Sequence, residues 1–435
     1  MSRIPRLVVL WYIALTVLAL FGAHTLTVSD IFAGLVLTWT LGLVFVLAFV
    51  HWEPPTMIQS ASPQEAREER RRVRFLVLAS VMSVAISILL IRFYTGNTPS
   101  QVFVSLLQQE SLYHRYQTYF QEQELWRFSL QKVPVVLLSA LLKLSLVYTF
   151  ISVLALRRSL TAGRFVILVV TGASYLLFSA ARGTSFELFE LFLLIGFSLT
   201  IRGMIWQADT GSRRKSSVVL LALAVAFLTL YSYNISTRFG TSLSTYYCVT
   251  LELCKNPESL LYLVSPALGE LSFLLAGYFS FGIFFSSSFI SSIWSSSFSN
   301  LIRGLFPLGF TGSYGIREGV CDRIIDCGSA WMPDSMVLLQ YLGVVGLVAL
   351  TFALGRIARL LTARATGVRD LYAAEVLYFV VLAMFSLPVG NFLLISSSNI
   401  LSFIVILAFY FWSRSVNNRK PRIQRHHGYY RRLAP

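Results

Sequence analysis

Arginines that can bind phosphate lie at two points where long apolar runs end. Arg182 interrupts the apolar stretch 175–197 (YLLFSAARGTSFELFELFLLIGF), and Arg238 follows the run 217–235 within NISTRFG. A guanidinium presents a planar fork of N–H donors that grips phosphate oxygens bidentately, which lysine does not do. A lone cation beside hydrocarbon is costly unless it lies at a water boundary or has a partner. We therefore expect both arginines at a membrane interface, at the depth of a lipid-linked diphosphate, or else as headgroup anchors or surface ion pairs.

The predicted outer side of the membrane is rich in arginine relative to lysine. Only Lys132 and Lys255 accompany the eight arginines there, which are Arg92, Arg115, Arg127, Arg182, Arg238, Arg303, Arg317 and Arg323. This bias favours bidentate binding of phosphate, and it makes Arg115 a further candidate for substrate binding. Acids are close in sequence to Arg127, Arg317 and Arg323, so a surface ion pair is the alternative for these three. Arg92 is predicted to be an interface anchor.

Two carboxylates, Glu270 and Glu187, are candidates for a general base. Glu270 is the only acid within the apolar stretch 259–276, where burial would raise its pKa toward a useful range. Glu187 and Glu190 lie three residues apart on one face of a helix start, close to Arg182. For these two, ordinary pairing with Arg182 is the alternative to catalysis.

Apolar runs of about 20 residues, the length that crosses a bilayer, must position these side chains. The chain has 435 residues, of which 56% are hydrophobic and 13% charged. We predict an all-α polytopic membrane protein with about ten spans (ten to twelve), at 7–26, 31–50, 75–94, 133–155, 165–181, 186–205, 217–235, 336–355, 370–388 and 393–413. The first run is too long for a typical signal peptide, so it is interpreted as a retained helix.

The basic residues orient these spans. With both termini cytoplasmic, 25 of the 36 Lys and Arg residues fall in cytoplasmic segments, and Lys143 lies within a span. This positive-inside distribution accounts for the net charge of +16 without nucleic-acid binding, and the tail 414–435 is predicted to meet anionic lipid headgroups.

The predicted organisation has four parts. Residues 1–235 form about seven spans with an outer loop at 95–132, 236–335 form a large outer loop, 336–413 form three spans, and 414–435 form the basic tail. Within the large loop, 281–306 has apolar residues at helical spacing and serines opposite them, which predicts an interfacial or re-entrant amphipathic helix. The alternative is a pair of spans at 259–276 and 281–300 with a turn near 277–280.

All four cysteines fall in the large loop as two copies of one spacing, CVTLELC (Cys248 and Cys254) and CDRIIDC (Cys321 and Cys327). This clustering favours disulfides in an oxidising compartment, either within each pair or between the pairs; free thiols are the alternative.

Several classes of chemistry have no sequence support. No Walker A loop, no nucleotide-binding glycine motif and no H-E-x-x-H motif is present, and the five histidines do not cluster outside the tail. We expect no metal and no cofactor.

The organisation resembles the O-antigen polymerases, the Wzy-type polymerases of oligosaccharide repeat units. The resemblance rests on the helix–Arg–Gly–helix SAARGTSFELFELFLL, on LLAGYFSFG in the large loop, and on the return helix PDSMVLLQYLGVVGLVALTFALG, and it spans most of residues 75 to 413. It implies an all-helical membrane glycosyltransferase of the GT-C-like class, in the bacterial inner membrane, with its active side in the periplasm. The implied role is in the biosynthesis of lipopolysaccharide and other surface polysaccharides.

The resemblance also implies the reaction. A hydroxyl of one undecaprenyl-diphosphate-linked repeat unit attacks the anomeric carbon of the growing chain, and undecaprenyl diphosphate leaves without help from a metal. Arginines stabilise the leaving diphosphate, a role that falls to Arg182 and Arg238, and then to Arg303 and Arg317. Aromatic side chains of the outer loops, Tyr278 among them, would stack on sugars or belong to an interfacial belt. The resemblance also implies a chain-length regulator protein as a partner.

Two rival functions share parts of this pattern. An O-antigen ligase has the same architecture and differs in its acceptor. A flippase or other transporter of lipid-linked oligosaccharides would require charges deep in the helices and duplicated halves, and Lys143 is the one internal charge that the sequence indicates.

Overall fold

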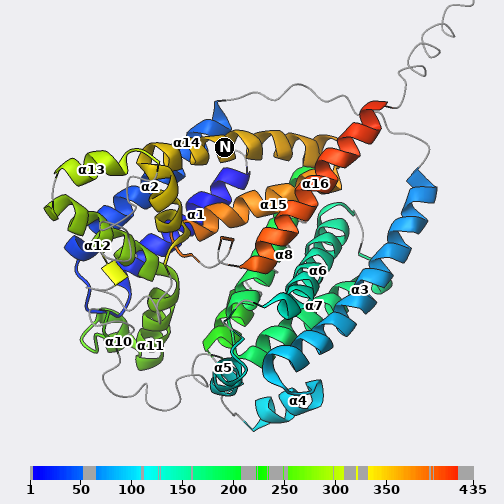
Figure 1. Ribbon diagram of the computed structural model, residues 1–435, viewed down its shortest axis with the longest axis horizontal. Helices are drawn as coiled ribbons and strands as arrows, with labels where there is room; N and C mark the ends of the chain where they lie inside the picture. Colours follow the sequence, from blue (N-terminus) through cyan, green and yellow to red (C-terminus); the bar gives the residue numbers. More distant parts are fainter. Residues whose placement is uncertain are drawn as a thin grey trace, which may run out of the picture.

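The described part of the chain is helical and contains no β-sheet (Figure 1). The computed structural model describes residues 3–51, 65–108, 112–125, 127, 129–157, 160–206, 222, 224–232, 234, 248, 253–296, 298–307, 320–321, 332–390, 393–394 and 396–419. Within these ranges, nine helices are long and apolar enough to cross a membrane. A helix pairs its own backbone N–H and C=O groups, as hydrocarbon requires. The architecture is therefore that of an all-α polytopic membrane protein.

Eight of these nine helices coincide with predicted spans. They are α1 (Arg3–Phe21), α2 (Val28–Val50), the Val73–Thr95 part of α3 (Glu65–Thr95), α6 (Val133–Phe150) continued by the π-helical turn η2 (Ile151–Ala155), α7 (Ala162–Arg182), α8 (Phe186–Ile205), α14 (Asp334–Gly367) and α16 (Ser397–Arg419). The predicted span 370–388 forms a shorter apolar helix, α15 (Leu371–Ser386). The predicted span 217–235 lies only partly within the described residues.

The ninth helix lies within the predicted large loop. Helix α11 (Pro266–Leu275), the π-helical turn η4 (Ala276–Ser280) and α12 (Phe281–Ser296) are continuous, and Pro266–Ser292 is long enough to span. There is consequently no turn at 277–280, so the alternative of two separate spans is wrong, and Pro266–Ser292 is a candidate for one span. Its serine face is buried in the first half of α12, where Ser286 and Ser287 are 2% and 1% exposed, whereas Ser291 is exposed. Burial is possible because a serine can satisfy its hydroxyl on its own helix, as Ser286 does on the carbonyl of Gly282.

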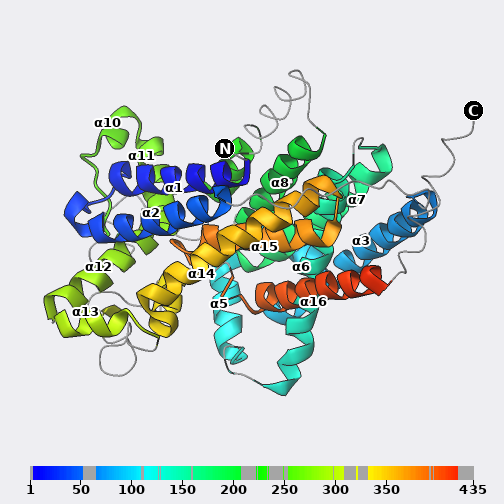
Figure 2. The same cartoon turned by 90° about the horizontal axis from the view of Figure 1, so that it is seen from above.

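The helices pack in two groups that α8 and α15 connect. In one group α2 contacts both α12 and α14, and in the other α3 contacts α6 and α7 (Figures 1 and 2). Gly34 of α2 lies directly on the carbonyl of Ile283, so a small residue allows α2 and α12 to approach closely. Helix α15 is buried on all sides, as expected of an apolar helix at the centre of a bundle.

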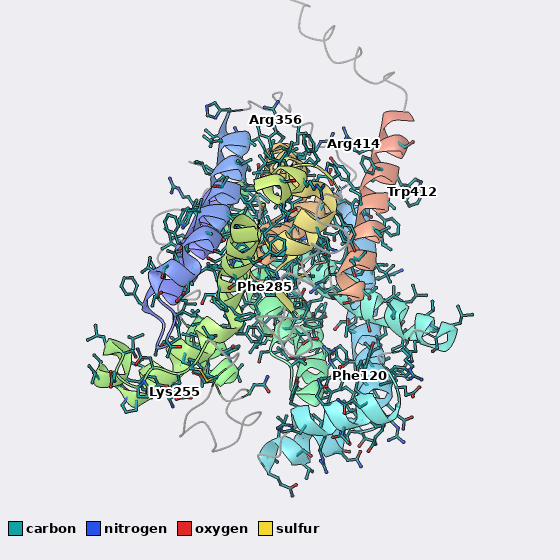
Figure 3. All side chains as sticks on the ribbon, turned by 60° about the vertical axis from the view of Figure 1, so that its left-hand side comes forward. Phe120, Lys255, Phe285, Arg356, Trp412 and Arg414 are labelled. Atoms are coloured by element: carbon teal, nitrogen blue, oxygen red, sulfur yellow. A yellow bond between two sulfur atoms is a disulfide. The ribbon has the colours of Figure 1, made fainter. Side chains whose placement is uncertain are left out.

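Charged and loop-forming segments gather at two opposite ends of the molecule. Figure 3 shows Arg356 and Arg414 near one end, Lys255 and Phe120 near the other, and Phe285 between them. The second end also holds α4 (Pro99–Leu107), α5 (Leu112–Glu122) and α10 (Leu260–Val264), which lie at the lower edge of Figure 1. The segments predicted to be cytoplasmic and those predicted to be external at 95–132 and 253–265 are thus separated in space.

A disulfide-closed loop is attached to the turn between α1 and α2. Cys248 and Cys254 are bonded to each other, so this pair closes locally, and Cys321 is also in a disulfide. The backbone of Cys254 accepts from Thr25 N–H at 3.0 Å, and Asn256 N–H donates to Ala23 at 3.0 Å. The local pairing of Cys248 with Cys254 is confirmed, and the free-thiol alternative is wrong; Cys327 lies outside the described residues.

His24, in this turn, makes the attachment sensitive to pH. Burial lowers the pKa of His24 below its ordinary value, and its Nδ1 is buried with no hydrogen-bond partner among the described residues. The unfolded chain protonates His24 near pH 6.5 while the folded chain keeps it neutral, so stability is lost as the pH falls below about 6.5. We expect the apparent Tm to fall between pH 7.5 and 5, and to fall less in His24→Gln. The exposed His51→Gln serves as the control, and an equal fall in all three proteins would contradict the prediction.

Candidate functional site

Arg182 is the last residue of α7, where the chain turns sharply into α8. Gly183 ends the helix in the left-handed conformation (φ 59°), which glycine adopts without strain. A Cβ at this position would lie 2.6 Å from the backbone nitrogen of Tyr113, so glycine also permits α5 to approach. Asn234 donates to Ser185 Oγ at 2.8 Å and to the carbonyl of Gly183 at 3.3 Å, which holds the turn from the far side.

The guanidinium of Arg182 is mostly buried, with its side chain 17% exposed. It pairs with Glu187, whose side chain is 5% exposed and also accepts from Thr184 Oγ1 at 2.7 Å. The guanidinium carbon lies 4.2 Å from the ring centroid of Phe178, 5.8 Å from that of Tyr94 and 5.9 Å from that of Tyr116. Its Nε is buried and has no hydrogen-bond partner among the described residues. Aromatic faces stabilise a cation that has left bulk water.

Helix α5 lies against this turn and contacts α7 and α3. Burial raises the pKa of Tyr116 above its ordinary value, and the charge of Arg182 opposes that rise only in part. Tyr116 therefore stays a neutral phenol beside the guanidinium. It contributes a ring and a hydroxyl to the surroundings of Arg182 without cancelling its charge.

A second polar cluster lies deeper, among four helices. Lys143 of α6 forms an ion pair with Glu190 of α8, and each side chain is 1% exposed. Tyr175 of α7 donates to Glu190 Oε2 at 2.5 Å, and Asn399 of α16 donates to Glu190 Oε1 at 2.5 Å. The alternative of pairing with Arg182 is therefore confirmed for Glu187 and wrong for Glu190. Helical geometry places the two acids on one face, but Glu190 lies almost a turn further into the bundle and meets Lys143 instead.

Glu270 is not the isolated buried acid that its apolar neighbourhood predicts. Its side chain is 25% exposed and pairs with Lys255 at 2.6 Å, and it accepts from Tyr262 Oη at 2.7 Å. Burial and the hydrogen bond to Glu270 raise the pKa of Tyr262, which keeps this phenol a donor. The apolar stretch did not predict this pairing, because Lys255 lies outside the stretch, next to the disulfide.

The remaining candidates are scattered. Arg115 lies on α5 beside Tyr116. Tyr278 packs against Tyr231 and Phe279, and Phe279 contacts Phe189 of α8, so Tyr278 belongs to an aromatic cluster near the start of α8. Arg303 is on α13 (Phe298–Gly304), which packs against α12 and α14 away from α5 and α7 (Figure 1).

The other arginines have mixed outcomes. Arg127 pairs with exposed Glu124 at 2.9 Å, as expected of a surface ion pair. Arg92 is exposed and donates to the carbonyl of Gly96. Arg238, Arg317 and Arg323 lie outside the described residues.

Sequence reasoning missed Asn399 and Tyr175 as partners of the buried ion pair. The available signal was that Lys143 is a lone cation in an apolar run and requires an internal partner. Among the residues that the structure describes, no group of three or more His, Cys, Asp or Glu side chains is arranged to hold a metal.

Together these features define a polytopic helical membrane protein in which Arg182, at the end of a candidate span, is enclosed by one carboxylate and three aromatic rings. No family model, no curated protein and no solved structure matches the chain.

Proposed function

We propose that this protein polymerises undecaprenyl-diphosphate-linked oligosaccharide repeat units into a surface polysaccharide at the outer face of the bacterial inner membrane. The observation that supports this most is Arg182, a mostly buried guanidinium at the end of a candidate spanning helix, held by one carboxylate and three aromatic rings. Such a group suits an anion at the lipid–water boundary, because a preorganised cation in partly dry surroundings stabilises charge more strongly than one in water.

The proposed step is a displacement at an anomeric carbon. An acceptor hydroxyl forms a new C–O bond there, and the bond to the diphosphate oxygen breaks. The electron pair leaves with undecaprenyl diphosphate, and Arg182 stabilises the charge that accumulates on it. Glu187 is the better candidate to receive the hydroxyl proton, because it already contacts Arg182, whereas Glu270, on α11, pairs with Lys255. Glu187 and Glu270 each have a cationic partner, so whichever of them acts as the base must release that partner before it accepts the proton.

The deciding experiment is an extension assay. Purified protein in nanodiscs would receive lipid-diphosphate-linked repeat units from the source strain in the presence of EDTA and without nucleotide. A ladder of products that differ by one repeat unit is expected. A single shifted band that requires added lipid A core would instead identify a ligase.

The buried Lys143–Glu190 pair specifically favours a second candidate, a transporter of lipid-linked oligosaccharides. Ionisable residues within spans often mark transport pathways. The same nanodisc preparation can be moved to proteoliposomes, and translocation of the lipid-linked substrate can be followed by its accessibility to a glycosidase. Translocation without a ladder would replace the polymerase proposal with this one.

A further inference from the structure

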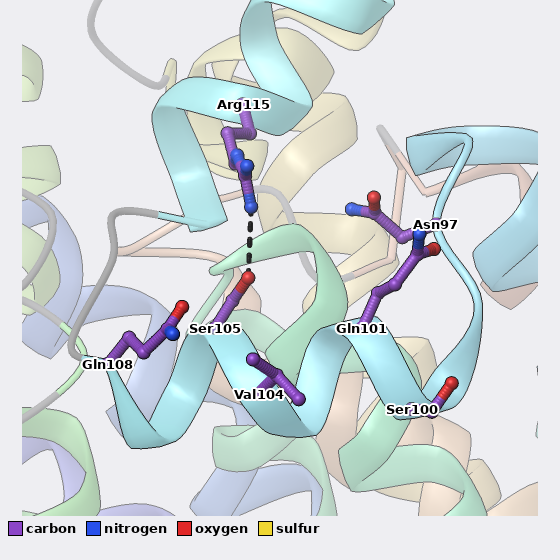
Figure 4. A pocket seen from close by; sticks show the side chains of 7 residues that line it. All are labelled: Asn97, Ser100, Gln101, Val104, Ser105, Gln108 and Arg115. Atoms are coloured by element: carbon purple, nitrogen blue, oxygen red, sulfur yellow. Dashed lines mark hydrogen bonds between the residues drawn. The ribbon is translucent and has the colours of Figure 1, made fainter.

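A polar groove lies between α4 and α5, at the same end of the molecule as Arg182. It has a volume of about 320 Å³ (Figure 4). The residues that line it are mostly amides and hydroxyls, namely Asn97, Ser100, Gln101, Val104, Ser105, Gln108 and Arg115. None of the described lining residues carries a carboxylate.

The sequence of α4 explains why these side chains share one wall. Residues 101, 104, 105 and 108 recur at the spacing of one helix face. Thr98 caps the helix, and its N–H donates to Gln101 Oε1 at 2.7 Å. This bond fixes the amide of Gln101 with its oxygen toward the cap, so its NH₂ group points away from the cap as a donor. Across the groove, Arg115 donates to Ser105 Oγ at 2.9 Å, and Figure 4 shows it reaching down toward Ser105.

Helix α5 joins this groove to the arginine site. Arg115 and Tyr116 are consecutive residues, yet Arg115 lines the groove while Tyr116 packs 5.9 Å from the guanidinium of Arg182. The backbone of Tyr113 lies against Gly183, the residue directly after Arg182. A ligand whose anionic end lies at Arg182 therefore has a polar surface for its remainder on the other face of the same helix.

The chemistry of the lining indicates what that remainder is. Amide and hydroxyl groups donate and accept hydrogen bonds, which matches the hydroxyls of a sugar, and the exposed Val104 offers an apolar surface to its C–H groups. Beside the groove, the ring of Tyr119 packs on Gly96, next to Asn97. Among the lining residues that the structure describes, the one charge is the cation of Arg115, which attracts a carboxylate and repels an ammonium.

We infer that this groove binds the glycan part of the substrate and prefers carboxylated or neutral sugars to sugars with free amines. The inference rests on the proposed function for its biological meaning, because it assigns the sugar-binding half of the same substrate. The binding preference itself requires only that the α4–α5 groove bind a saccharide.

Binding can be measured without any reaction. Full-length protein in nanodiscs would be titrated with three soluble tetrasaccharides: a hyaluronan fragment with carboxylates, chitotetraose with N-acetyl groups, and its deacetylated form with amines. We expect affinity to decrease in that order. Loss of a hydrogen bond to a charged group should make Arg115→Gln bind the hyaluronan fragment about tenfold more weakly. Its binding of chitotetraose should change less, whereas Gln101→Ala should weaken both.

Two variants on the same outer segment provide matched controls. Arg127→Gln removes an exposed arginine whose partner is Glu124, and Gln121→Ala removes an exposed amide of α5; neither residue lines the groove. Equal binding of all three tetrasaccharides, or equal loss in groove and control variants, would overturn the inference. Binding that is competed away by peptides of similar size would also overturn it and would indicate a protein partner.

The extension assay separates this inference from the proposed function. A polymerase with a glycan groove should show a higher KM and little change in kcat in Gln101→Ala. Tetrasaccharide binding without any product ladder would leave the glycan site standing and defeat the polymerase proposal. A product ladder without selective tetrasaccharide binding would support the polymerase proposal and overturn the glycan site.

Discussion

Replacing Arg182 with lysine is expected to lower the rate of repeat-unit polymerisation by about 100- to 1,000-fold, the usual loss when a preorganised charge-stabilising donor is removed. The substitution keeps the positive charge and loses the planar fork, so it tests bidentate phosphate binding in particular. The loss should appear in kcat, because charge on the diphosphate develops as the bond breaks. Product ladders quantified over time with saturating donor would give that rate.

Controls must separate catalysis from folding, because Arg182 also neutralises Glu187, which is 5% exposed. Arg182→Ala leaves that carboxylate buried without its partner and can fail to fold, so the apparent Tm of each variant is measured before its activity. Arg92→Lys, at the exposed end of α3, is the matched arginine control and should retain full activity. If Arg182→Lys folds and polymerises at the wild-type rate, Arg182 is an anchor and the proposed role is wrong.

The second large effect concerns stability. Lys143→Met should destabilise the folded protein by about 3–5 kcal/mol, because it leaves the carboxylate of Glu190 buried without its cation. The remaining donors, Tyr175 and Asn399, are neutral and cannot balance that charge. The double variant Lys143→Met/Glu190→Gln should recover most of the loss, since an amide at position 190 carries no charge and can still hydrogen-bond both neighbours.

The apparent Tm in nanodiscs would measure this effect. Lys132→Met, at the residue directly before α6, is the lysine control. Lys132 is only partly buried, and its contacts are to backbone carbonyls of the loop, so little change is expected. A Lys143→Met protein as stable as the wild type would contradict the assignment of a buried ion pair. A double variant with normal Tm and normal polymerisation would make the pair structural, while one with normal Tm and lost translocation would favour the transporter.

The positions of most spans could be read from the sequence, because length and hydropathy are local properties and hydrocarbon demands helix. For the same reason Arg182 could be located at a helix end, since it stands between two apolar runs and precedes a glycine. The pairing of Cys248 with Cys254 was one of the open possibilities, and its short separation made the local bond accessible.

Which side chains meet was decided by the tertiary structure alone. Glu190 and Lys143 are 47 residues apart, and helical periodicity defines the face that a residue occupies but not the helix that covers the face. The single helix at Pro266–Ser292 was not predicted for a related reason: its serines read as a solvated face. Ser286 and Ser287 are buried, because a serine can bond to its own helix, as Ser286 does, and because Gly34 lets α2 approach closely. The groove beside Arg115 likewise exists only because α5 folds back across α4 and onto the end of α7. Length and polarity thus determine where this chain crosses a membrane, whereas close packing between distant segments decides which charges are paired and which surfaces remain open.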